Sequence, residues 1–339
     1  MKQYGIVLIG CGHIGKEHIE NIYYKDNIHI VAVIDTDIER AELFLKKYHA
    51  DFSDTDYHTY INRDDVDIVI AATYTQSHLS ILKDCISAGK HLLCEKPIAC
   101  NAADGEEFYR LVKNSPVHVS VAHILRYNQT YRRVKELIDA GTIGELKLMR
   151  MVQNHHCKDW ERYQKLLKDC SPILDCGVHY FDVMQWFSNS RIAHVSGIGT
   201  VLDDKNHDFD YNYGIVNLEL ENGAVGYYEA GWSPSIMSAN IKEFVGTKGS
   251  ISITLQAFRS SHVEEGDLIE IYTKKDNTYC SLNINAQYKP MWKQLQALID
   301  LIENRPSEAP SMEDVYSAFR VGICADEAIR QKKRLSVLL

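Results

Sequence analysis

The stretch YGIVLIGCGHIG, residues 4–15, decides the fold of the first part of the chain. Its apolar, β-branched start predicts a strand buried on both faces, and three glycines follow at once, namely Gly10, Gly12 and Gly15. In such a unit the glycines allow a tight turn, close approach of the backbone to a pyrophosphate, and close packing of the next helix on the strand. The helix start, with His13 and Ile14, offers N–H groups and a positive dipole end to phosphates. The stretch therefore predicts a dinucleotide site, or else a tight strand–turn–helix that binds nothing.

Asp35 stands at the end of the next predicted strand, residues 28–34, twenty residues after the last glycine of the motif. A carboxylate at that position can accept hydrogen bonds from the ribose hydroxyls of an adenosine group, and it repels a 2′-phosphate. Arginine and lysine are absent from the residues that follow until Arg40. The sequence therefore favours NAD as the cofactor, with NADP the weaker candidate.

The pattern of strands changes about one third of the way along the chain. Up to about residue 123, strands alternate with helices, which is typical of βαβ units and a parallel sheet. Beyond it, paired strand-like runs are joined by turn residues at 221–223, 246–249 and 274–277, which predicts antiparallel hairpins. Helices are predicted at 173–187, 291–303 and 313–330. We expect an α/β protein with an N-terminal Rossmann dinucleotide-binding domain (1–123) and a C-terminal α+β domain (124–339) that has a large, mostly antiparallel open sheet.

Composition narrows the class of protein. The chain of 339 residues has 37 Lys and Arg against 46 Asp and Glu, so its net charge of −9 argues against nucleic-acid binding. It shows no apolar run long enough for a membrane span and no secretory signal, so we expect a cytoplasmic protein without membrane partners. The nine cysteines form no CxxC pair, which favours reduced thiols. Cys170, Cys176 and His179 match no common zinc spacing, so no metal is expected.

Two segments carry side chains suited to chemistry. Glu95-Lys96-Pro97 follows a predicted parallel strand, at the sheet edge where ligands bind, and Lys96 could polarise a substrate oxygen there; the alternative is a simple turn. Asp175, His179 and Asp182 share one face of the predicted helix 173–187. A histidine beside a carboxylate is a candidate general base, and the alternative is an ordinary polar stripe.

Taken together, these residues resemble the glucose–fructose oxidoreductase, inositol dehydrogenase and rhizopine-catabolism (Gfo/Idh/MocA) family. The resemblance covers essentially the whole chain, and its most specific part is the order Glu95-Lys96-Pro97 followed by Asp175-x-x-x-His179-x-x-Asp182. Further matches are Thr73-x-x-x-x-His78, Gly89-Lys90-His91, Gly141-x-Ile143-Gly144 and Gly246-Thr247-Lys248-Gly249. One departure is Cys170-Ser171-Pro172-Ile173-Leu174, where relatives often have a glycine-rich stretch, and this leaves the shape of the substrate pocket open.

The resemblance implies hydride transfer between a nicotinamide cofactor and a secondary hydroxyl of a sugar, sugar derivative or cyclitol. It implies catalytic roles for Lys96, Asp175 and His179. The expected cofactor contacts are Gly10, Gly12, His13, Ile14, Gly15, Asp35, Thr73, His78, Glu95 and Lys96. The expected substrate contacts are Lys96, Arg126, Asn154, His155, Asp175 and His179.

The resemblance also implies a homodimer or homotetramer formed through the open sheet. Two alternatives remain on the same scaffold: a glycoside hydrolase that uses NAD transiently, and a non-catalytic NAD-binding regulator. Retention of Lys96, Asp175 and His179 together speaks against the regulator. The positions of Cys11, Cys94 and Cys176 next to the motifs predict that these thiols line the cofactor and active site. The substrate itself and the conformation of residues 153–174 cannot be predicted.

Overall fold

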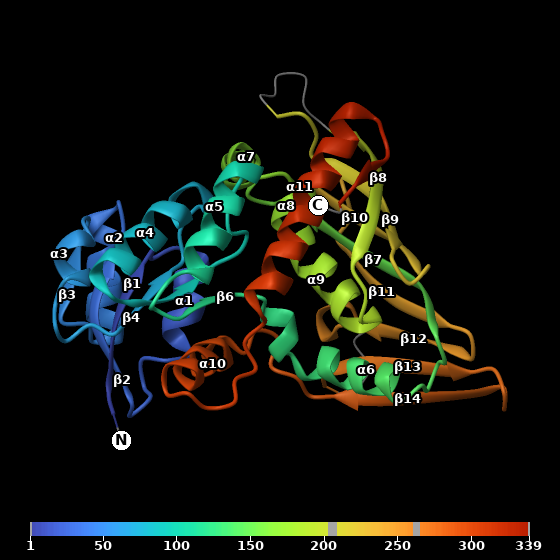
Figure 1. Cartoon of the computed structure of the whole chain (residues 1–339), viewed down its shortest axis with the longest axis horizontal. Coiled ribbons are helices and arrows are strands. Elements are labelled where there is room, and N and C mark those ends of the chain that lie inside the picture. Colours follow the sequence, from blue (N-terminus) through green and yellow to red (C-terminus); the bar gives the residue numbers. More distant parts are fainter. Residues whose placement is uncertain (1, 203–208, 260–264, 338–339) are drawn as a thin grey trace. The chain divides into compact units, whose positions relative to one another are not determined.

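The computed structural model describes residues 2–202, 209–259 and 265–337. The chain forms two compact units (Figure 1). The first unit comprises the chain up to Tyr127 together with Lys289–Tyr316, and the second comprises Asn128–Tyr288 together with the chain from Ser317 on. The chain first leaves the first unit after Tyr127, close to the predicted domain boundary at residue 123. The return of Lys289–Tyr316 to the first unit departs from the expectation of two continuous domains.

The first unit is built on a parallel sheet whose order is β3-β2-β1-β4-β5-β6 among the described residues. Its strands are β1 (Tyr4–Ile9), β2 (Ile28–Ile34), β3 (Phe52–Asp54), β4 (Ile68–Ala71), β5 (His91–Cys94) and β6 (Val119–Val121). Its helices are α1 (His13–Glu20), α2 (Ile38–Tyr48), α3 (His58–Ile61), α4 (His78–Ala88), α5 (Ala102–Lys113) and α10 (Met291–Ile302), with short 3₁₀ turns η1 (Thr75–Ser77) and η2 (Ile124–Tyr127). From β1 the chain places β2 and β3 on one side and β4, β5 and β6 on the other, which is the strand order of a doubly wound sheet. The predicted Rossmann fold is therefore confirmed.

Helix α10 packs into the core of this unit, although it follows the other unit in the chain. Its residues Leu295, Leu298 and Ile299 belong to the same buried cluster as Ile6 and Leu8 of β1. The tyrosine hydroxyl of Tyr4 also donates a 2.8 Å hydrogen bond to Glu303, just after the helix. An apolar helix face is stable only against another apolar surface. Here that surface is provided by the first unit.

The second unit contains a sheet of nine described strands in the order β14-β13-β12-β11-β7-β10-β9-β8-β15. These are β7 (Leu146–His156), β8 (Ile192–Thr200), β9 (Tyr213–Leu220), β10 (Val225–Ser233), β11 (Ala239–Gly246), β12 (Gly249–Thr254), β13 (Asp267–Thr273), β14 (Thr278–Ile284) and β15 (Leu335–Ser336). Within the described part of this second sheet only β7 and β10 pair in parallel, so the expected mostly antiparallel sheet is confirmed. All three predicted hairpins are present, as β9–β10, β11–β12 and β13–β14.

Helices cover one face of this sheet. They are α6 (Gln129–Asp139), α7 (Trp160–Asp169), α8 (Pro172–Asp175) and α9 (Gly177–Ser188), with the 3₁₀ turn η3 (Gln256–Phe258) in a loop. Helix α11 (Met312–Gln331) begins in the first unit and continues in the second, where Ile329 packs against Gly197 and Gly214 of the sheet. Successive strand residues point to opposite faces, so this helix layer decides which side chains are enclosed.

None of the helices described has both the length and the apolar character that a membrane span requires. All nine cysteines are free thiols, and six of them are buried. This is the arrangement expected where thiols serve as small apolar side chains.

Candidate active site

The glycine loop has the geometry that a dinucleotide requires. Gly10 has φ +96°, and a Cβ there would lie 2.3 Å from the carbonyl oxygen of Ala72. A Cβ on Gly15 would lie 1.8 Å from the carbonyl oxygen of Gly10, so both positions demand glycine for packing. A Cβ on Gly12, the N-cap of α1, would meet no described atom within 4 Å. The missing side chain at Gly12 therefore leaves open space at the helix N-terminus, as close approach of a pyrophosphate would need.

Asp35, the predicted ribose contact, lies beside the glycine loop. Its carboxylate is buried at the end of β2 and accepts a 2.8 Å hydrogen bond from the backbone N–H of Cys11, within the glycine loop. Arg40 places a guanidinium nitrogen 3.4 Å from both carboxylate oxygens of Asp35. Arg40 follows Asp35 by five residues in the sequence, and the first turn of α2 brings its side chain back to the Asp35 carboxylate. The Asp35 carboxylate, on which the prediction of NAD depends, therefore has a cation beside it.

His78 connects two loops at the carboxyl edge of the sheet. Its side chain is completely buried, with Nδ1 2.8 Å from the carbonyl oxygen of Pro97 and Nε2 3.3 Å from the carbonyl oxygen of Thr73. Thr73 in turn shares a 2.6 Å hydroxyl–hydroxyl hydrogen bond with Ser77. His78 was predicted as a cofactor contact. The structure places it where it holds the Thr73 loop against the segment that carries Lys96.

Glu95 forms a buried pair with His18 of α1. The distance from His18 Nε2 to Glu95 Oε1 is 2.8 Å, and the second carboxylate oxygen accepts from the Lys96 N–H at 3.2 Å. Burial opposes the charge of Glu95, but the hydrogen bond and electrostatic attraction of His18, with that of Lys96, outweigh burial and lower the pKa of Glu95. The Lys96–Pro97 peptide bond is cis. An ionised Glu95 thus anchors the backbone N–H of Lys96.

No feature of the sequence pointed to His18 as the partner of Glu95, because the two residues lie 77 positions apart. Arg126, a predicted substrate contact, follows β6 and places its guanidinium 3.3 Å from the carboxylate of Asp314. Asp314 lies in the segment that returns to the first unit. These partners depend on chain segments that meet only in the folded unit.

In the second unit, Asp175 and His179 lie on two short consecutive helices instead of the single helix predicted. Asp175 ends α8, and His179 lies in the first turn of α9. The hydroxyl of Ser171 caps α8 by accepting from Leu174 N–H at 3.0 Å, and it donates to buried Asp326 at 2.6 Å. Helix α8 is therefore fixed at its N-terminus by α11, which holds the backbone that bears Asp175.

Gly177 has a packing role. A Cβ at this position would lie 2.7 Å from the ring of Phe181 and 3.1 Å from the ring of Tyr228. The rings of Phe181 and Tyr228, both in the same unit, account for the need for glycine here. Glycine lets the first turn of α9 rest directly on Tyr228 of the sheet.

Asn154 and His155, both predicted substrate contacts, lie on opposite faces of the sheet. His155 pairs with Trp232 in the register of β7 and β10, on the face that the helices cover. Asn154 pairs with Gly231 and donates a 2.6 Å hydrogen bond to Glu229 on the other face. Of the two, His155 is the one on the face that bears the helices with Asp175 and His179, although Asn154 is the more buried residue. The alternation of a strand separates the two neighbours, and the sequence motif alone did not show where that alternation begins.

Helix α7 adds Tyr163 to the same face. His155 Nδ1 lies 3.0 Å from the Tyr163 hydroxyl, and the Tyr163 ring meets the edge of Trp232 at a centroid distance of 5.5 Å. Burial raises the pKa of Tyr163 to about 12, with smaller contributions from Cys157, Cys176 and Asp175. The segment whose conformation the sequence left open thus brings a phenol close to the turn that carries Asp175.

The prediction that three thiols line the site is wrong for Cys11 and Cys94. The Cys11 side chain belongs to the apolar core of the first unit, and Cys94 is completely buried. Burial raises the pKa of Cys11 to about 12 and raises the pKa of Cys94 well above its ordinary value. Cys11 contributes only its backbone to the glycine loop, where its N–H donates to Asp35. Cys176 is 7% exposed, and its thiol lies 3.7 Å from the carboxylate of Asp175.

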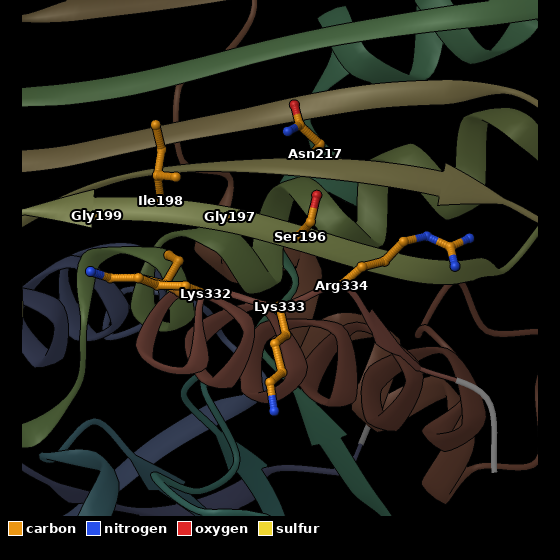
Figure 2. A pocket seen from close by; sticks show the side chains of 9 residues that line it. Ser196, Gly197, Ile198, Gly199, Asn217, Lys332, Lys333 and Arg334 are labelled. Carbon is orange, nitrogen blue, oxygen red and sulfur yellow. The ribbon is translucent and has the colours of Figure 1, made fainter.

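A surface hollow of about 480 Å³ lies elsewhere in the second unit, between β8 and the end of α11. Three consecutive basic residues line it, namely Lys332, Lys333 and Arg334. Figure 2 shows their side chains pointing in three different directions, and Arg334 forms a 2.8 Å ion pair with Glu219. The cations do not converge on one point, so this hollow lacks the geometry of an anion site.

Comparisons with known proteins agree with this geometry. The family model described as "Oxidoreductase family, NAD-binding Rossmann fold" matches residues 4–123, and the Gfo/Idh/MocA C-terminal domain model matches residues 131–252. Myo-inositol 2-dehydrogenase of Thermotoga maritima is 24% identical over 98% of both chains. Inositol 2-dehydrogenase of Salmonella typhimurium is 31% identical over 54% of both chains. A crystal structure of an oxidoreductase domain protein from Kribbella flavida has a TM-score of 0.84 at 21% identity and covers 100% of both chains. The chain belongs to the Gfo/Idh/MocA oxidoreductase family.

Proposed function

We propose that this oxidoreductase transfers a hydride between NAD and a secondary hydroxyl of a sugar, sugar derivative or cyclitol. The observation that carries the proposal is the glycine loop at the end of β1, open at Gly12, with Lys96 presented at the end of β5 in the same sheet. In a doubly wound sheet, ligands bind at this carboxyl edge of the strands. A redox cofactor and a cation that can act on an oxygen atom therefore share one edge.

NAD is the proposed cofactor. The pyrophosphate would be held by the start of α1 and the glycine loop, Gly10, Gly12 and Gly15. Asp35 would accept hydrogen bonds from the ribose hydroxyls. The hydrogen bond from Cys11 N–H fixes the Asp35 carboxylate in place, which supports this role. Arg40 works in the opposite direction, because a guanidinium beside the ribose site can accommodate a 2′-phosphate. We expect Asp35 to dominate, since it is buried whereas Arg40 is about half exposed.

The nicotinamide, when bound, supplies the acceptor or donor of the hydride. His179 takes the proton of the substrate hydroxyl during oxidation, and Asp175 orients and supports the imidazole. Lys96 stabilises the negative charge that develops on the same oxygen atom. The buried Glu95–His18 pair holds the backbone at Lys96, so the cation needs no rearrangement as the charge develops. In the reverse direction His179 returns the proton to the alcohol.

A cyclitol is the first substrate to try. The relatives of Thermotoga maritima and Salmonella typhimurium bear inositol dehydrogenase names. Polar groups on the helix-covered face of the second unit, namely His155 and Tyr163, are suited to hydrogen bonds with several hydroxyls. We further propose a homodimer or homotetramer formed through the other face of the nine-stranded sheet, and a cytoplasmic location, which the free thiols favour.

A spectrophotometric screen for NADH formation over cyclitols, polyols and aldoses tests the proposal. Stoichiometric NADH from at least one secondary alcohol is the expected result, with NADP giving slower turnover. Glycoside cleavage without net NADH would contradict it in favour of the transient-oxidation hydrolase. NAD binding with no turnover across the panel would contradict it in favour of a regulator.

A further inference from the structure

Lys242 is a fully buried lysine on the helix-covered face of the second unit. It lies on β11, paired with Met151 of β7 and Ile253 of β12, and its side chain is 1% exposed. Nζ has no hydrogen-bond partner among the residues that the structure describes. A buried ammonium without a partner is costly, so lysine is a poor choice for a position that serves packing alone. Phe244, two residues further on the same face, shows the ordinary solution, because it packs against Phe187 of α9.

The amine of Lys242 lies beneath the first turns of α9. Nζ is 5.1 Å from the centroid of the Tyr180 ring, and Tyr180 directly follows His179 in the chain. Tyr180 stacks on Tyr228 of β10 at a centroid distance of 5.0 Å. Tyr228 is the ring on which Gly177 rests. Lys242, Tyr180 and Tyr228 thus form one buried platform under the helical turn that presents His179.

Few groups can compensate a charge at this position. Asp267 of β13 attracts it, but that carboxylate already accepts from Thr130 at 2.6 Å and from the Gln256 N–H at 2.8 Å. Burial outweighs Asp267 and lowers the pKa of Lys242 to about 7. Other titratable side chains act on the platform: the phenols of Tyr131, Tyr180 and Tyr228, whose pKa burial raises, together with Cys176, Asp175 and Tyr288. The buried phenols stay neutral near pH 7, so Lys242, besides the imidazole of His179, is a group whose charge can change there.

We propose that Lys242 is a positioning residue for His179, acting through the Tyr180–Tyr228 platform. The protonated amine attracts the face of the Tyr180 ring, and the neutral amine attracts it less. The protonation state of Lys242 therefore changes both the support of α9 and the electrostatic potential at its first turns. This inference rests on the proposed function only for its kinetic test.

The first measurement needs no substrate. Histidine NMR of the full chain follows the ring of His179, assigned by its loss in His179→Gln. We expect the wild-type signal to report two titrations, one belonging to the imidazole and one to Lys242. Lys242→Met, which keeps the side-chain length without the amine, should remove the second titration. Lys275→Met, at an exposed turn of the same sheet, is the matched control and should retain both.

The kinetic test uses a hydroxyl substrate found in the screen. Lys242→Met should lower kcat roughly 10-fold with little change in KM, and it should flatten the rate profile around pH 7. Lys242→Arg, which stays charged, should also flatten the profile but retain more activity. If no alcohol is oxidised by the wild-type protein, the proposed function fails, and the NMR titration still decides the role of Lys242.

Two outcomes overturn the inference. One is a wild-type His179 signal with a single titration, a result that does not depend on the folding of any Lys242 variant. The other is a folded Lys242→Met protein whose His179 titration, kcat and pH profile all match those of Lys275→Met.

Discussion

Two buried titratable groups, Glu95 in the first unit and Lys242 in the second, differ in what burial does to their charge. Glu95 in the first unit has a partner, since His18 lies 2.8 Å away, and its pKa is lowered. Lys242 in the second unit has no hydrogen-bond partner among the described residues, and burial lowers its pKa to about 7. Burial penalises charge in both places, and the presence of a partner decides whether the group keeps it. A paired charge is a fixed support, whereas a lone amine responds to pH.

The largest expected effect comes from removing the two side chains that we propose act on the reacting oxygen, Lys96 in the first unit and His179 in the second. Lys96→Met and His179→Gln should each lower the rate of hydride transfer by about 10²–10⁴-fold, because each removes a group that acts on the reacting oxygen. NAD affinity should stay within about 3-fold, since neither residue lies in the glycine loop. Stopped-flow measurement of NADH formation and a NAD titration check both statements. A wild-type rate in either variant would contradict the catalytic role that we propose for the substituted residue.

Breaking the paired charge should cost the most stability. In His18→Leu, Glu95 stays buried without its partner, so we expect a loss of about 3 kcal/mol in the free energy of unfolding at pH 7. The wild-type pair contributes stability above the ordinary pKa of glutamate, and this contribution is lost as pH falls through the lowered folded-state pKa of Glu95.

The deficit of His18→Leu should therefore shrink toward pH 5, where the unpaired carboxyl takes up a proton. Urea unfolding at both pH values measures this change. His29→Leu removes an exposed pair with Asp51 and is the control, with an expected loss below about 1 kcal/mol. Equal losses in the two variants would show that the burial of Glu95 is unimportant.

Removing the lone amine should have the opposite sign. The folded-state pKa of Lys242, about 7, lies below its ordinary value of 10.5, so the unfolded chain holds the extra proton between these limits. Wild-type stability should rise with pH from about 7 to about 10.5, and Lys242→Met should abolish this rise. At pH 7 the variant should be more stable by on the order of 2 kcal/mol. Denaturant unfolding across this pH range, with Lys275→Met for reference, decides the point, and destabilisation at pH 7 would contradict it.

A smaller effect is expected at the proposed ribose site, where buried Asp35 pairs with Arg40, whose side chain is about half exposed. Asp35→Asn should weaken NAD binding about 10-fold and narrow the preference over NADP, since it replaces a charged acceptor of the ribose hydroxyls by a neutral amide and removes the repulsion of a 2′-phosphate. Arg40→Ala should weaken NADP binding more than NAD binding. Calorimetric titrations with both cofactors measure these ratios. An unchanged ratio in Asp35→Asn would contradict the proposed cofactor preference.

The smallest effect concerns the thiols. Cys280 is exposed, whereas Cys11 and Cys94 are enclosed in the core. A maleimide reagent should therefore modify Cys280 first and leave NAD binding unchanged, and Cys280→Ser should remove this fast labelling. Mass spectrometry of the labelled peptides identifies the site. Fast labelling of Cys11 that NAD prevents would restore the prediction made from the motif position.

Much of the fold could be predicted from local patterns. The parallel sheet, the hairpins and the helix at Met291–Ile302 follow from apolar runs, turn residues and helical periodicity, which act over a few residues. The association of Met291–Ile302 with the first unit could not be predicted, because an apolar helix face does not state which surface will cover it. The same limit applied to His155 and Asn154, whose faces depend on the helix layer.

The sequence by itself determined the glycine loop, the carboxylate at Asp35, and the placing of Lys96, Asp175 and His179 in motifs that resemble one family. These depend on short spacings and on the chemistry of each residue type. Only the tertiary structure decided which charges are paired. It brought His18 to Glu95, placed Arg40 against Asp35, and enclosed Lys242 beneath Tyr180. Whether a buried group keeps its charge depends on neighbours that are distant in sequence, so it is settled only when the chain has folded.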